Sequence, residues 1–214
     1  MKNNIRSLAL IADNYPSKGN MSLVFVQQLV EQFVDLGVDV TVIAPQSLTK
    51  CIVRGEKLRP KDTEVTTKKG NSYKVCRPYF VSTGNHLNCI KGVVDYLRKR
   101  EILNIIKHIN PDVIYGHFWH NLLPVYKYAN IHNVPLFVAC GEGDNALEEL
   151  VKYISPDDKL LLAKTVTGVI SVSSENKRKC VEFGLAKVDN VVVLPNCVNT
   201  DIFHPHTNWN RRRE

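Results

Sequence analysis

Short apolar segments alternate along the chain with longer amphipathic ones. Segments of strand length and apolar character lie at residues 5–12, 38–44, 113–117, 136–140, 168–172 and 191–194. Residues 22–36 repeat apolar positions with helical spacing, and Gly37 follows as a natural helix stop. Because strands that alternate with helices form parallel βαβ units, we expect an α/β fold with a Rossmann-like, doubly wound parallel sheet.

The remaining helices are predicted from the same periodicity and from capping residues. Helical patterns also cover residues 86–109 (as one helix or two), 119–132, 144–153 and 174–183. A further helix is expected after Ser155, an N-cap residue that precedes a proline and two acids. Residues 46–80 depart from this alternation. Within them, residues 64–77 alternate around Gly70 and Asn71, which predicts a β-hairpin.

Composition limits the class of protein. A chain of 214 residues suffices for one substantial α/β domain, and no run of eighteen apolar residues predicts a membrane span. The apolar run that ends at Asp13 is short and lacks a small-residue cleavage site, so we expect no signal peptide. The six cysteines include no Cys-x-x-Cys pair, which favours reduced thiols in a cytoplasmic protein and disfavours structural zinc.

Positive charge is concentrated in one segment. The chain has a net charge of +7, and residues 50–108 hold 14 Lys and Arg against 5 Asp and Glu. This segment is either an ordinary solvated surface or a patch for an anionic partner, such as a phospholipid leaflet or a lipid-pyrophosphate acceptor. Nucleic acid is disfavoured as a partner, because the segment contains no aromatic-rich RNA motif and no helix-turn-helix pattern.

Candidate ligand-binding loops follow the predicted strands, because parallel sheets of this kind bind ligands at the carboxyl ends of their strands. These loops are residues 13–21, 45–50, 117–121, 141–145 and 173–176. In the first loop a glycine allows close backbone approach, and the helix behind it offers free N–H groups to an anion. The loop could equally be a plain strand-to-helix turn. Its candidate binding residues are Tyr15, Lys18, Gly19 and Asn20.

Two further candidates lie in the central loops. His117 ends a predicted strand, where an imidazole can hydrogen-bond a sugar hydroxyl or a phosphate. His120 would form a metal pair with it only if a third ligand were near, and no metal site is expected. Glu142 could orient a hydroxyl group of a ligand, or it could simply be an acid near a helix N-terminus.

The last predicted strand runs into Pro195 and Asn196, and the segment ends with Phe203 and Pro205. This segment resembles the "strand, Pro-Asn-Gly-Val-Asp, Phe-x-Pro" hinge of family 4 retaining glycosyltransferases of the GT-B fold, with Cys197 in place of the usual glycine.

Two other stretches carry the same resemblance. Residues 112–117 are similar to the family's "Asp-x-Ile-His-x-His" strand ending. Residues 135–144 are similar to "Pro-Val-Val-x-Thr-x-His-Gly-x-Asp", with Gly141 at the usual His position. The first loop matches the family's Gly-Gly element only in part.

The resemblance implies that residues 1–195 are the N-terminal, acceptor-side domain of such an enzyme, and that residues 196–214 are an interdomain hinge and a truncated tail. Asn196 and Cys197 would be hinge residues. The family's donor-binding Glu-x7-Glu motif belongs to a second domain; Glu56 and Glu64 share its spacing without its context. The chain would therefore need a separate donor domain, no cofactor beyond a nucleotide-sugar substrate, and no divalent metal.

The implied function is transfer of a sugar from a nucleotide-sugar to a polysaccharide or lipid-linked acceptor, in polysaccharide or lipopolysaccharide assembly at the inner face of the plasma membrane. One alternative is a non-catalytic module that binds an acceptor or a membrane while another chain supplies the donor domain. A second alternative is an NAD-dependent oxidoreductase, because residues 141–146 fit a Gly-x-Gly-x-x-Ala fingerprint. That fingerprint lies late in the chain, and its acid at position 142 would repel a pyrophosphate.

Overall fold

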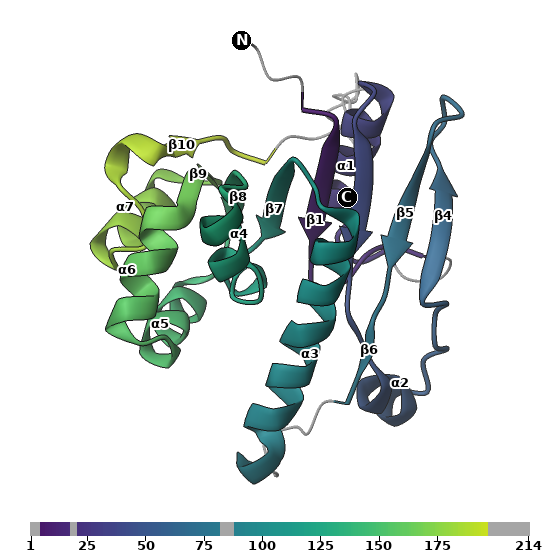
Figure 1. The fold of residues 1–214 in the computed structure, drawn as a ribbon, viewed down its shortest axis with the longest axis horizontal. Helices are drawn as coiled ribbons and strands as arrows, with labels where there is room; N and C mark the ends of the chain where they lie inside the picture. Colours follow the sequence, from purple (N-terminus) through teal and green to yellow (C-terminus); the bar gives the residue numbers. More distant parts are fainter. Residues whose placement is uncertain (1–4, 18–20, 82–87, 197–214) are drawn as a thin grey trace, which may run out of the picture.

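The computed structural model describes residues 5–17, 21–81 and 88–196 and is built on an eight-stranded sheet (Figure 1). The strands lie in the order β10-β9-β8-β7-β1-β2-β5-β4, and every pairing is parallel except that of β4 with β5. Their bounds are β1 (Ser7–Ile11), β2 (Asp39–Ile43), β4 (Asp62–Thr66), β5 (Ser72–Cys76), β7 (Val113–His117), β8 (Leu136–Cys140), β9 (Val166–Ser171) and β10 (Val191–Val193).

The order of the strands confirms the predicted doubly wound topology. From β1 the chain proceeds outward to β2, returns to β7 on the other side of β1, and continues through β8, β9 and β10. The direction of winding therefore reverses between β1 and β7. In open α/β sheets, this reversal leaves a crevice at the carboxyl ends of the two strands.

Helices cover both faces of the sheet. Their bounds are α1 (Val24–Asp35), α3 (Asn88–Ile109), α4 (Tyr126–His132), α5 (Asp144–Tyr153), α6 (Pro156–Thr165) and α7 (Ser174–Glu182). Leu8 and Leu10 of β1 pack with Val30 of α1, whereas Ile11 packs with Ile106 of α3 on the opposite face. Successive side chains of a strand point to opposite faces, so the two cores follow directly from the alternation along β1.

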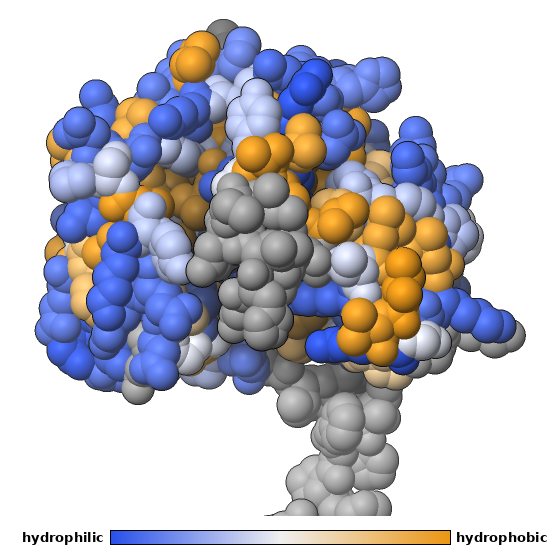
Figure 2. All heavy atoms as spheres, turned by 90° about the horizontal axis from the view of Figure 1, so that it is seen from below, coloured by the Kyte–Doolittle hydropathy of each residue, from blue (hydrophilic) through white to orange (hydrophobic). Residues whose placement is uncertain are grey.

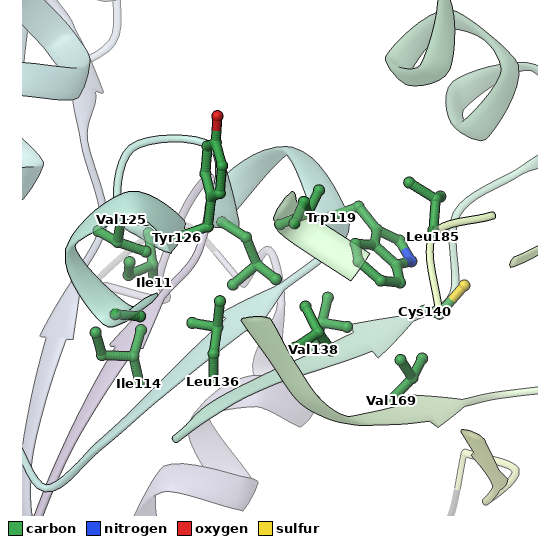
Figure 3. Close-up of a cluster of buried hydrophobic side chains, with 14 of the residues drawn as sticks. Ile11, Ile114, Trp119, Val125, Tyr126, Leu136, Val138, Cys140, Val169 and Leu185 are labelled. Carbon is green, nitrogen blue, oxygen red and sulfur yellow. The ribbon is translucent and has the colours of Figure 1, made fainter. Parts of the chain in front are cut away.

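The larger core contains the indole of Trp119, which is fully buried (Figure 3). The ring lies over Val138 and Cys140 of β8 and beside Leu185. Trp119 is the second residue after β7, so its burial anchors the loop that follows this strand to the core.

Several predicted helix ends are confirmed. Gly37 and Gly184 follow α1 and α7 with φ angles of 87° and 67°, a conformation that favours glycine. The hydroxyl of Ser155 accepts the backbone N–H of Asp158 at the start of α6. The predicted hairpin is also present, as β4 and β5.

Two predictions were wrong in detail. The single helix expected over residues 119–132 is a short 3-10 helix, η1 (Trp119–Leu122), followed by α4. Pro124 explains the break, since proline has no backbone N–H to continue the helical hydrogen bonds. The sequence pattern predicts no regular element in the segment before the hairpin, yet the structure has β3 (Gln46–Ser47) and α2 (Leu48–Arg54) there. β3 pairs with β6 (Tyr79–Phe80) in a separate parallel sheet of two strands.

The helix predicted as one or two over residues 86–109 is one helix over the described residues, α3, and a second short 3-10 helix, η2 (Val188–Asn190), precedes β10. Among the residues that the structure describes, no helix is both long and apolar enough to cross a membrane. Four cysteines within these ranges, Cys51, Cys76, Cys140 and Cys180, are free thiols.

Candidate functional site

The loops after β1 and β7 lie next to each other at the point where the winding of the sheet reverses. The two strands pair as far as Ile11 and Gly116, so Asp13 and His117 follow at the same edge. Across this edge, Nε2 of His120 lies 2.6 Å from Oδ1 of Asp13. Both side chains are partly exposed, at 38% and 42%, so this pair forms the rim of the site rather than its floor.

His117 lies deeper in the site and has no polar partner among the residues that the structure describes. Its side chain is buried, with 6% of the residue exposed, and neither ring nitrogen forms a hydrogen bond. The rings of Phe25 and Phe118 lie 5.2 and 4.3 Å from the imidazole, centroid to centroid. Burial lowers the pKa of His117 to about 4, although the nearby carboxylate of Asp13 opposes this shift.

At neutral pH His117 is therefore an uncharged imidazole with one N–H donor and one acceptor nitrogen, both unpaired. One hydroxyl group can accept from the N–H, and a second hydroxyl group can donate to the other nitrogen. An unpaired buried polar group costs about 1–3 kcal/mol, so the free protein holds this side chain at an energetic cost that a hydroxyl ligand would relieve.

The backbone after β7 is shaped to present this side chain. Phe118 has a φ of 79°, which is uncommon for a residue other than glycine. The side-chain amide of Asn121 donates to the carbonyl of His117 at 2.5 Å and holds the turn closed. Gly116 lies beside it, and a Cβ at this position would overlap the side chain of Leu122, which would then have to move. The strained turn is thus held from several sides, as is common at functional sites.

Glu142 ties the loops of neighbouring strands together. Its carboxylate accepts the backbone N–H of Trp119 at 2.5 Å and that of Gly141 at 3.1 Å. The carbonyl of Glu142 in turn accepts the side-chain amide of Asn176 in α7, at 2.9 Å. Burial raises the pKa of Glu142, and the two backbone N–H groups oppose this shift. The carboxylate is therefore bonded to the backbone of the site loops rather than to the N-terminal turn of α5.

Of the candidate binding residues in the first loop, one lies in the core and the other three lie outside the described residues. Tyr15 is only 1% exposed, and its hydroxyl donates to that of Tyr73 at 3.0 Å, so its ring faces the core. Lys18, Gly19 and Asn20 lie outside the described residues. Of the predicted hinge residues, Asn196 is exposed just beyond β10, and Cys197 lies outside the described residues.

Arg59 is a residue of the site region that the sequence did not point to. Its guanidinium donates to Oδ1 of Asn14 at 2.7 Å and to the carbonyl of Tyr15 at 3.0 Å, which fixes the loop after β1 from outside. The two segments are far apart in the sequence, and no spacing or motif connects them. The pairing of Asp13 with His120 was missed for the same reason.

A separate surface surrounds α2. Ile52 and Val53 are 80% and 85% exposed, and the neighbouring Lys50, Arg54 and Lys57 are also exposed. Figure 2 shows apolar side chains gathered at the end of the molecule where α2 lies, with hydrophilic ones around them. Within the described ranges, no three His, Cys, Asp or Glu side chains come close enough together to hold a metal ion.

Residues 24–202 of the chain match the model of a family described as Glycosyltransferase Family 4. No curated protein matches the chain.

Solved structures resemble the fold. A glycosyltransferase from Rickettsia africae has a TM-score of 0.51 and 16% identity; the match covers 98% of this chain and 48% of that one. A UDP-N-acetylglucosamine 2-epimerase from Rickettsia bellii has a TM-score of 0.53 and 11% identity, over 88% of this chain and 44% of that one. Anabaena HepE in complex with UDP and glucose has a TM-score of 0.50 and 12% identity, over 93% and 46%. The chain thus spans about half the length of these proteins, and at these identities the likeness shows the fold alone.

Proposed function

The chain belongs to glycosyltransferase family 4, and from this premise we propose that it is the acceptor-binding domain of a sugar-transferring enzyme. The observation that carries the proposal is His117, a buried, uncharged imidazole with two unpaired nitrogens at the reversal point of the sheet. A hydroxyl can act as donor or acceptor, so the hydroxyl groups of a sugar acceptor can pair with either nitrogen.

In the complete reaction, a sugar moves from a nucleotide-sugar to the acceptor hydroxyl with retained anomeric configuration. The donor is held by a second domain, in the same protein or in a separate chain. The role of the domain described above is to position the acceptor. His117 binds the acceptor, the Asp13–His120 pair lines the rim of the site, and Glu142 holds the loop after β7 in place. Positioning and stabilisation of the leaving diphosphate are the main sources of rate in such a reaction.

Glycan binding tests the proposal directly. The purified chain is applied to an array of immobilised glycans of defined structure, alongside His117→Phe and a matched control, His108→Gln, which changes an exposed histidine on α3. We expect selective binding of a subset of glycans, at least tenfold weaker for His117→Phe and unchanged for the control. Absence of glycan binding, or equal binding by both variants, would contradict the proposal.

A second measurement separates an enzyme from a binding module. We expect negligible sugar transfer by this chain alone from a panel of nucleotide-sugars, and transfer once a chain with the family's Glu-x7-Glu motif is supplied. Robust transfer by the 214-residue chain would overturn the need for a donor domain. The alternative of a non-catalytic module is supported if no such partner restores transfer while glycan binding persists.

An NAD-dependent oxidoreductase is disfavoured by a specific contact. In a dinucleotide fingerprint the backbone N–H groups of the glycine-rich turn face the pyrophosphate. Here the N–H of Gly141 is already bonded to the carboxylate of Glu142, which would also repel a pyrophosphate. Tight binding of NAD in a titration would revive this alternative.

The basic and apolar surface around α2 supports docking to an anionic membrane. In this proposal the exposed side chains of Ile52 and Val53 enter the lipid interface, and the exposed Lys50, Arg54 and Lys57 contact acidic headgroups. Each cation near such a surface contributes about 1 kcal/mol, and the contribution is screened by salt.

Sedimentation with vesicles of phosphatidylcholine and phosphatidylglycerol tests this docking. We expect binding that falls with salt and that is at least tenfold weaker in an Ile52→Ser, Val53→Ser double variant. Ile131→Ser removes another highly exposed apolar side chain, from α4, and this variant is expected to bind as the unchanged protein does. If binding is unaffected both by salt and by the double substitution, docking through this surface is ruled out.

A further inference from the structure

A cluster of basic and amide side chains lies at the carboxyl ends of β2 and β5, beside the loop after β1. Gln46 opens β3 soon after β2, and Arg77 follows β5 directly. The backbone brings Arg59 to the same place: the N–H of Arg77 donates to the carbonyl of Lys61, and the hydroxyl of Tyr79 donates to the carbonyl of Arg59, each at 2.5 Å. Three segments distant in sequence thus converge on Gln46, Arg59 and Arg77.

Two buried donors in this cluster have no acceptor within the described part of the chain. Arg77 is 3% exposed; its Nη1 donates to the hydroxyl of Thr63 at 2.9 Å, and its Nε forms no hydrogen bond. Gln46 is 2% exposed; its Oε1 accepts from Nε of Arg59 at 2.6 Å, and its Nε2 forms no hydrogen bond. Because a guanidinium can only donate, the contact with Arg59 fixes which side of the amide is the oxygen and leaves the NH₂ group as the unpaired one.

The charges in the cluster are also uncompensated. Burial lowers the pKa of Arg77, and the next largest cause is the positive charge of Arg59. Neither guanidinium forms an ion pair in the part of the chain that the structure describes. Two neighbouring cations and two unpaired buried donors are unfavourable in the free protein, and the same oxyanion would relieve both deficits.

We propose that Gln46, Arg59 and Arg77 form a binding site for a phosphate group. A phosphate supplies several acceptor oxygens around one centre and a charge that offsets two guanidinium groups, and arginine is the residue best suited to bind it. Arg59 already holds the loop after β1 through Asn14 and Tyr15, so phosphate binding would also order that loop. The site uses none of the side chains assigned to acceptor hydroxyls, so it stands or falls independently of the proposed function.

Two sources could supply this group: free inorganic phosphate or pyrophosphate, and a diphosphate carried on a larger apolar molecule. Isothermal titration of the full chain with inorganic phosphate, inorganic pyrophosphate and geranyl diphosphate distinguishes them. Tighter binding of geranyl diphosphate than of pyrophosphate supports the site with a lipid-linked ligand. Equal binding supports the site with the free anion.

Variants locate the binding. Arg59→Gln removes one guanidinium from a half-buried position, and the matched control Lys68→Gln removes the same charge from an exposed position in the turn between β4 and β5. We expect saturable binding of one equivalent, weakened at least tenfold by Arg59→Gln and unchanged by Lys68→Gln.

The Nε–Hε resonance of Arg77 in the unchanged protein gives a second readout that needs no core substitution. It is expected to shift on addition of pyrophosphate. The proposal is overturned if none of the three anions binds saturably, if the two variants weaken binding equally, or if the Arg77 resonance does not move.

Discussion

Replacement of His117 by leucine is predicted to stabilise the protein while it removes the proposed ligand contact. The imidazole is 6% exposed, and its two nitrogens are unpaired. An unpaired buried polar group costs about 1–3 kcal/mol, so an apolar side chain of similar size is expected to raise the free energy of unfolding by about that amount at pH 7.5. For a domain of this size, each kcal/mol corresponds to about 2–4 °C in Tm.

The pH dependence gives the sharper signature. His117 has a pKa of about 4 in the folded protein against 6.5 as a free side chain. Below pH 6.5 the unfolded chain takes up a proton at this position and the folded chain does not. The contribution of the neutral His117 to the free energy of unfolding is therefore fully present above pH 6.5 and is lost as the pH falls toward 4. Linkage gives a loss of about 2 kcal/mol between neutral pH and pH 5, which the leucine variant should not show.

Urea unfolding at pH 7.5 and pH 5 measures both effects. The difference in unfolding free energy between His117→Leu and the unchanged protein is expected to widen by about 2 kcal/mol at the lower pH. His108→Gln, on the exposed surface of α3, serves as the control and should follow the unchanged protein at both values. If the leucine variant lost stability with falling pH to the same extent as the unchanged protein, His117 would not be a buried neutral imidazole.

Three further predictions follow from single contacts. Glu142→Ala leaves the backbone N–H groups of Trp119 and Gly141 without an acceptor and should lower the free energy of unfolding by about 1–3 kcal/mol in urea titration, more than Glu142→Gln does. Ser155→Ala removes the cap of α6 and should lower the free energy of unfolding by about 1 kcal/mol in the same titration. An unchanged urea midpoint would show that the cap does not stabilise the protein. Gly116→Ala adds a methyl group where the side chain of Leu122 lies and should lower Tm; a Leu122→Ala partner change should recover part of the loss, and strict additivity of the two changes would refute the contact.

The fold was predictable from local signals. Apolar runs such as residues 113–117 match β7, and the helix stop at Gly37 and the cap at Ser155 lie where the residue types require them. The error over residues 119–132 came from a periodic pattern that ignored Pro124. The short β3 and α2 were missed because elements of two to seven residues carry little periodicity of their own.

The site was predictable only in part. The sequence points to His117 as a candidate because a strand end in a parallel sheet is a known position for ligand-binding residues. Its unpaired nitrogens and the bonds of Glu142 to the loop backbone depend on side-chain directions that no spacing encodes. The sequence suggests Tyr15 for ligand binding in the first loop, whereas in the structure its ring faces the core.

The sequence by itself determined the class of sheet, the ends of most helices and the family, because these depend on periodicity, capping and short motifs within one segment. Tertiary structure alone decided which polar and charged side chains find a partner and which do not. Arg59 meets Asn14 and Gln46 across segments far apart in the chain, and His120 meets Asp13 in the same way. Pairing and burial are properties of the folded whole, since a side chain loses its water and finds its partners only when distant segments pack together.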